Sequence, residues 1–228
     1  MSSRVAGIDG AKGGWVVAEV IPGSPTCSIR FEPTIAPVVA ELGTRLSSIV
    51  VDMPIGLSDD GVRPVDAVVR ARLGARHSTF FPTPLRDVLG HATWETANAS
   101  SRELRGKGLS KQAWNIVPKI AEVDRAWSPS LSESLVEGHP EVSFSEMAGA
   151  PVLTRKSSTE GRTQRVDLLR AHLDVDVEAA LADTPKAWRI DAIDALALAW
   201  SATRVAMGNA TWLGGDVDGC GRPMQLVL

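Results

Sequence analysis

The chain has 228 residues, of which 44% are hydrophobic, and its formal net charge is −3. This length suits one large domain or two small ones, and the charge argues against a strongly basic nucleic-acid coat while allowing a local basic groove. No uncharged apolar run reaches the length of a membrane span and the first residues do not resemble a signal peptide, so we expect a cytoplasmic protein outside the membrane. Cys27 and Cys220 lack a metal-type spacing and are expected to be reduced.

The N-terminal part of the chain predicts a mixed sheet. Apolar and alternating patterns predict three antiparallel strands over residues 5–9, 15–20 and 27–31. A helix is predicted over residues 36–46, and the apolar run that ends at Asp52 predicts a central parallel strand over residues 48–52. Three antiparallel strands, a crossover helix and a central strand favour an α/β fold.

The rest of the chain is expected to be mainly helical. Helices are predicted over residues 64–75, 94–105, 111–127, 141–148, 161–172 and 191–207. Pro118 predicts a kink or break in the third of these helices. A fifth strand is predicted over residues 134–138, and residues 224–228 form either a final strand or a packed tail. We predict a single domain over residues 1–228 with a helical insertion at about 60–130.

The last predicted helix carries two acids on an otherwise apolar segment. Asp191 and Asp194 are three positions apart, so both carboxylates point to one face of the helix. Two buried like charges are costly unless a cation lies between them, which favours a metal site. The alternative is an acidic pair that stabilises the helix N-terminus through the macrodipole.

Three further acids end predicted strands. Asp9, Asp52 and Glu137 each fall at a carboxyl end, where open α/β sheets place their ligand sites. Because all of these ligands are oxygens, we expect Mg²⁺ or Mn²⁺ rather than Zn²⁺. Two such ions can activate water and stabilise the leaving oxygen of a phosphodiester, with Asp9 as the bridging ligand. Lys12 is a candidate phosphate contact or an ordinary surface lysine.

Two segments are locally basic. Residues 102–119 carry five basic residues against one acid, and residues 154–165, which include Lys156 and Arg162, carry four against one. Each segment is either a phosphate-gripping surface or a solvated face. Phe80 and Phe81 are either base-stacking residues or core residues.

The order of strands, helices and acids resembles the ribonuclease H-like fold, with antiparallel strands 1–3, parallel strands 4–5 and flanking helices. The final acidic helix resembles that of RuvC-type Holliday-junction resolvases, whose paired aspartates bind metal. The whole chain is similar to the DUF429 family of predicted ribonuclease H-like nucleases. The matching segments are GIDGAKGGW at 7–15, VDMPIGL at 51–57, LSKQAWNIVPKIAEVD at 109–124, EGHPEVSF at 137–144 and the final helix.

The family resemblance implies that further polar residues face the same cleft: Gln112, Lys119, Glu122, His139, Glu141 and Lys156. Alternatives remain for some of them, since Lys119 and Glu122 have the spacing of a helical surface pair and His139 precedes a proline. Two features depart from a RuvC-like enzyme. The fourth strand ends in Asp52 rather than a glutamate, and residues 100–119 replace a junction-binding surface.

The sequence therefore favours a divalent-metal-dependent nuclease that uses Asp9, Asp52, Glu137, Asp191 and Asp194, with a nucleic acid as its partner. Two alternatives remain. One is a phosphohydrolase or phosphotransferase acting on a nucleotide or another small phosphorylated molecule, and the other is a non-catalytic binding protein on the same fold. The sequence leaves open the choice between DNA and RNA and the oligomeric state.

Overall fold

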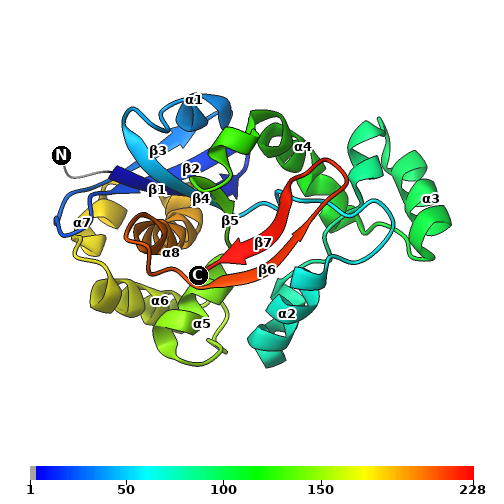
Figure 1. Ribbon diagram of the computed structural model, residues 1–228. Coiled ribbons are helices and arrows are strands. Elements are labelled where there is room, and N and C mark those ends of the chain that lie inside the picture. The colour runs from blue at the N-terminus through cyan, green and yellow to red at the C-terminus, as the bar shows by residue number, and fades with distance from the viewer. Residues whose placement is uncertain (1–3) are drawn as a thin grey trace.

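A computed structural model describes residues 4–228. Its central feature is a five-stranded sheet in the order β3-β2-β1-β4-β5 (Figure 1). The strands are β1 (Arg4–Ala11), β2 (Gly14–Val20), β3 (Cys27–Glu32), β4 (Leu46–Val51) and β5 (Leu135–Glu137). Strands β1, β2 and β3 pair antiparallel, whereas β4 pairs parallel to β1 and β5 pairs parallel to β4. The predicted mixed α/β sheet is confirmed.

The predicted helix over 36–46 is wrong in its length. Helix α1 covers only Ala36–Val39, and the chain then turns into β4 at Leu46. The turn contains Gly43 at a φ of 77°, a left-handed conformation that ends helices and favours glycine. A backbone hydrogen bond from Leu46 to the carbonyl of Glu41 closes the turn.

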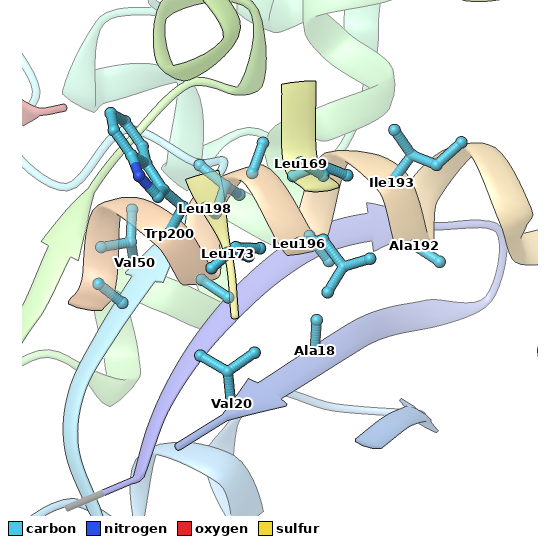
Figure 2. Close-up of a cluster of buried hydrophobic side chains, with 14 of the residues drawn as sticks. Ala18, Val20, Val50, Leu169, Leu173, Ala192, Ile193, Leu196, Leu198 and Trp200 are labelled. Atoms are coloured by element: carbon cyan, nitrogen blue, oxygen red, sulfur yellow. The ribbon is translucent and has the colours of Figure 1, made fainter. Parts of the chain in front are cut away.

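Helix α8 (Arg189–Ala206) covers one face of the sheet. Figure 2 shows α8 lying over β1 and β2, with Ala18 and Val20 pointing toward the helix. The approach is close because of Gly7, where an added Cβ would lie 2.0 Å from the carbonyl oxygen of Ala195. This contact fixes the position of the acidic helix relative to β1.

The remaining helices complete the layers. Between β4 and β5 the structure has α2 (Pro64–Leu73), three short 3-10 helices (Gly74–Thr79, Arg86–Gly90 and Pro129–Leu131), α3 (Trp94–Arg105) and α4 (Lys111–Ala126). After β5 come α5 (Pro140–Ala148), α6 (Thr159–His172), α7 (Val177–Ala182) and a 3-10 helix at Lys186–Trp188. Helix α4 continues through Pro118 without a break and buries Ile120 and Val123 in the core on the opposite face of the sheet from α8. The predicted insertion thus supplies part of that layer.

The C-terminal residues form a hairpin that the sequence only partly predicts. Strand β7 (Pro223–Val227) confirms the strand alternative for the tail, and it pairs antiparallel with β6 (Trp212–Val217). Val227 also forms a bridge to Gly138, directly after β5. Both cysteines are free, as expected. Within residues 4–228, no helix combines the length and apolar character needed to cross a membrane.

Candidate functional site

Asp9 and Asp52 lie side by side at the carboxyl ends of two parallel strands. Asp9 is in β1 and is only 6% exposed, and its Oδ1 accepts a hydrogen bond from the backbone of Gly10 at 2.8 Å. Asp52 follows β4, and its backbone nitrogen donates to the carbonyl of Ile8 at 2.9 Å. The sheet register therefore places the two carboxylates at one edge, as predicted.

Helix α8 brings the second pair of acids to the same place. Asp194 is 1% exposed, whereas Asp191 lies at the first turn and is half-buried. Burial raises the pKa of Asp9 well above its ordinary value, and the charges of Asp52, Asp194 and Asp191 raise it further. Burial likewise raises the pKa of Asp194 to about 6, against the lowering effect of Lys156. We call these four residues the acid cluster: Asp9, Asp52, Asp191 and Asp194.

Lys156 supplies a positive charge to the acid cluster. It lies between α5 and α6, its side chain is 49% exposed, and its Nζ donates to Asp194 Oδ2 at 2.6 Å. Burial disfavours the ammonium, but the neighbouring carboxylates outweigh that effect and raise the pKa of Lys156. The predicted proximity of Lys156 to the acids is thus present in the fold.

The acid cluster has the donor chemistry for a hard divalent cation. Its donors are all carboxylate oxygens, the ligands that Mg²⁺ and Mn²⁺ prefer, and their mutual repulsion would be relieved by a cation. Among residues 4–228, no three acidic, histidine or cysteine side chains are already drawn together into a closed metal site. Binding of a metal would therefore require the acid cluster and Lys156 to rearrange.

Glu137 occupies a different environment from the acid cluster. Its two carboxylate oxygens accept hydrogen bonds from the two terminal nitrogens of Arg63, each at 2.8 Å, and Oε2 also accepts from the backbone of Ile55. Arg63 is 1% exposed and also binds Asp66. Burial raises the pKa of Glu137 although Arg63 opposes that shift. The predicted role of Glu137 as a metal ligand stays a prediction, with both of its oxygens already bonded.

A cavity of about 570 Å³ opens beside the acid cluster. Its lining includes Asp9, Asp52 and Asp191, together with Glu137. The other lining residues include an apolar set and a basic set. The apolar set includes Met53, Phe80, Phe81, Pro82, Pro84 and Ile116. The basic set includes Arg76, Arg155 and Lys156, beside His139 and Glu141.

The polar residues that the family resemblance implied divide into two groups. His139, Glu141 and Lys156 line the cavity. Glu141 is held by the buried Arg165, whose Nη2 lies 2.8 Å from both of its carboxylate oxygens. Glu122 instead supports the fold, because it accepts hydrogen bonds from the Trp15 indole and the Ile35 backbone.

The other predicted substrate contacts lie outside the cavity lining. Lys119 packs against Gly10, but its ammonium donates to the Gly14 carbonyl and lies over the Trp15 ring. Burial lowers the pKa of Lys119. Arg162 bonds to Ser157 and Thr159 at the start of α6. Lys12 and Gln112 are exposed and are not part of the lining.

Sequence reasoning missed Arg63 and Arg76. Arg63 is separated from Glu137 by 74 residues, so no local pattern links the two. Arg76 lies in the short 3-10 helix after α2 and faces Glu141 at 3.6 Å. The only available signal was the placement of each arginine near a helix boundary.

Comparison with known proteins identifies one family. A family model described as a protein of unknown function (DUF429) matches residues 7–218, from β1 to the residue after β6. No curated protein and no solved structure matches the chain.

Proposed function

Since the chain belongs to the DUF429 family, whose description names no function, we propose a function from the site itself: a divalent-metal-dependent nuclease that hydrolyses phosphodiesters. The observation that carries this proposal is the acid cluster. Four carboxylates, from β1, the residue after β4 and helix α8, lie near one another beside a cavity, and the charges of three of them raise the pKa of the fourth, Asp9. Such a cluster is unfavourable without a cation, which supports metal binding as its purpose.

The positions of the four acids suggest different roles in metal binding. Asp9 is central, because the charges of the other three all act on it, and it is the best placed to bridge two cations. Asp194 is the more buried of the two helix acids, and Asp52 and Asp191 are half-buried. When bound, two divalent ions would supply a nucleophilic water at neutral pH and neutralise charge on the phosphate and the leaving oxygen.

Basic residues at the cavity orient the phosphate in this proposal. Arg76 and Arg155 line the cavity, and guanidinium groups bind phosphate oxygens in bidentate fashion. Lys156 is close enough to pair with either Asp194 or a substrate phosphate. The buried position of Asp9 and Asp194 limits competing water, which strengthens the electrostatic interactions made there.

Cleavage of labelled nucleic acids in Mg²⁺ or Mn²⁺ tests the proposal. We expect cleavage by the wild-type protein and its loss by at least about a hundredfold in Asp9→Asn and Asp194→Asn, because each change removes a charged ligand. Asp174→Asn is the matched control, since Asp174 is exposed and lies outside the cavity lining. Unchanged cleavage in both variants of the acid cluster, with the apo proteins folded, would overturn the proposal.

A second candidate is a phosphohydrolase for a small nucleotide. The observation in its favour is the cavity, whose volume of about 570 Å³ is in the range of small-molecule sites. Salt separates the two candidates. Binding that relies on several backbone phosphates weakens steeply as salt is added, whereas binding of a mononucleotide responds weakly. A non-catalytic role predicts instead that Mn²⁺ leaves the melting temperature unchanged.

A further inference from the structure

Phe81 is an exposed aromatic residue inside the cavity. Phe81 is 45% exposed, and it lines the same cavity as Asp9 and Asp52. Eight large apolar residues among residues 4–228 are exposed, and Phe81 and Trp212 are the aromatic ones. Trp212 lies in β6 and is not part of the cavity lining. An uncovered aromatic ring beside a polar site is typical of a surface that a ligand covers.

The segment around Phe81 is built to hold the ring in place. Pro82 and Pro84 follow it, and proline restricts the backbone before binding occurs. Phe80 is buried and packs edgewise on His139, with ring centroids 5.3 Å apart. Arg70 donates to the Phe80 carbonyl at 2.9 Å, which ties the segment to α2. The platform is therefore preorganised, so little conformational entropy is lost when a flat ligand stacks on it.

The lining of the cavity also carries basic groups that suit a phosphate. Arg76, Arg155 and Lys156 line it, and the Arg76 Nε is buried with no hydrogen-bond partner among residues 4–228. The buried Nδ1 of His139 is also without a partner in that range. The exposed Phe81 ring and these basic side chains in one lining match the two halves of a nucleotide, its base and its phosphate.

We infer that the cavity takes one unpaired nucleobase, stacked on Phe81, so that the substrate is single-stranded nucleic acid. This inference rests on the proposed nuclease function and names its substrate class. In a duplex, both faces of each base are covered by the neighbouring bases. The Phe81 ring, which lines a cavity, can therefore stack on a base of a duplex only if that base leaves the helix. A single strand presents its base faces at much lower cost, and stacking is tolerant of sequence because every base has a π-face.

Fluorescence anisotropy in EDTA, where metal-dependent cleavage is absent, tests the inference directly. The probes are a short fluorescein-labelled single strand, as DNA and as RNA, and the blunt duplex of the same sequence. We expect at least one single strand to bind about tenfold or more tightly than the duplex. Phe81→Ala should weaken that binding by roughly 5- to 150-fold, the equivalent of one lost base stack. Phe81→Trp should retain it, because indole also stacks.

Trp212→Ala is the matched control, because it removes an exposed aromatic that lies outside the cavity. It should leave binding unchanged, and circular dichroism should show that both alanine variants are folded. Equal binding of duplex and single strand, no binding of either strand, or an unchanged affinity in Phe81→Ala would each overturn the inference. Phe81-dependent binding without any cleavage in Mn²⁺ would instead support the inference and overturn the nuclease proposal. Cleavage without a preference for single strands would support the nuclease proposal and overturn the inference about single strands.

Discussion

Arg63 and Glu137 form a buried bidentate ion pair in the lining of the cavity at the candidate site. The two terminal guanidinium nitrogens each lie 2.8 Å from a different oxygen of Glu137, and both residues are nearly inaccessible to solvent. Arg63 also donates to the Gly56 carbonyl at 2.9 Å. Because Gly56 belongs to the loop after Asp52, the ion pair links β5 to the segment that carries one acid of the site.

Loss of Arg63 should strongly destabilise the protein. Arg63→Met leaves Glu137 and Asp66 buried without their cation, which costs about 3–5 kcal/mol when one partner of a buried pair is removed. Chemical denaturation measures the loss. Arg170→Met is the control, because the ion pairs of Arg170 with Asp167 and Glu178 are exposed and should each be worth no more than about 1 kcal/mol. Equal losses in the two variants would contradict the assigned role of Arg63.

Gly7→Ala should separate α8 from β1. An added Cβ would lie 2.0 Å from the Ala195 carbonyl oxygen and 2.2 Å from the Ala199 nitrogen, so backbone must move. Overpacking of a core typically costs about 1–3 kcal/mol, and we expect a loss at the upper end. Gly90→Ala is the control, since nothing lies within 4 Å of its added Cβ. Thermal unfolding compares the two, and a Gly7→Ala protein as stable as the control would refute this contact.

Asp194 should make the metal-free protein less stable as pH rises. Burial raises its pKa to about 6, so the folded state holds the proton more tightly than the unfolded chain, whose aspartate titrates near its ordinary value of about 3.9. The stabilisation from the protonated group is complete below about pH 4 and is lost as pH rises through about 6. The shift of about two pKa units corresponds to about 3 kcal/mol.

Asp194→Asn should therefore gain stability relative to the wild type between about pH 4 and pH 7, measured by denaturation in EDTA. The gain should be largest at the upper end of this range, because the wild-type carboxylate is then ionised and buried. Asp174→Asn, at an exposed position, should follow the wild type at every pH. A constant difference between Asp194→Asn and the wild type would show that Asp194 does not titrate in this interval.

Lys156 should compete with a divalent cation for the acid cluster. Its ammonium lies 2.6 Å from Asp194 Oδ2 and half of the side chain is accessible, so it can withdraw. We expect Lys156→Met to lower the stability of the metal-free protein at pH 8 and to move the Mn²⁺ dependence of the melting temperature to lower concentration. Lys156→Arg keeps the charge and should resemble the wild type. Weaker Mn²⁺ binding by Lys156→Met would instead mean that the amine helps to retain the metal.

The sheet could be predicted because its signals are local. Apolar residues predominate in β1, β2 and β4, and an acid lies near the end of β1 and directly after β4. The same residues predicted the proximity of Asp9 and Asp52, since adjacent parallel strands end together. Helix α8 also follows from its apolar composition, and its docking on β1 brings Asp194 to the strand ends.

The features that were missed depend on distant partners or on weak patterns. Strand β6 is mostly exposed and contains Gly214 and Gly215, so it lacks the alternation of a half-buried strand. The predicted helix over 36–46 ignored the stop signal of Gly43. The pairing of Arg63 with Glu137 joins residues far apart in the chain, and only the folded structure brings them together.

The close packing of α8 on β1 also has a kinetic consequence. Asp9 lies in the first strand and Asp194 in the last long helix, so their charges are far apart and hydrated in the unfolded chain. Repulsion between them arises only when α8 docks, which requires contacts between the two ends of the sequence. An interaction formed late in folding acts mainly on the rate of unfolding. We therefore expect repulsion within the acid cluster to speed the unfolding of the metal-free protein, with detachment of α8 as an early step.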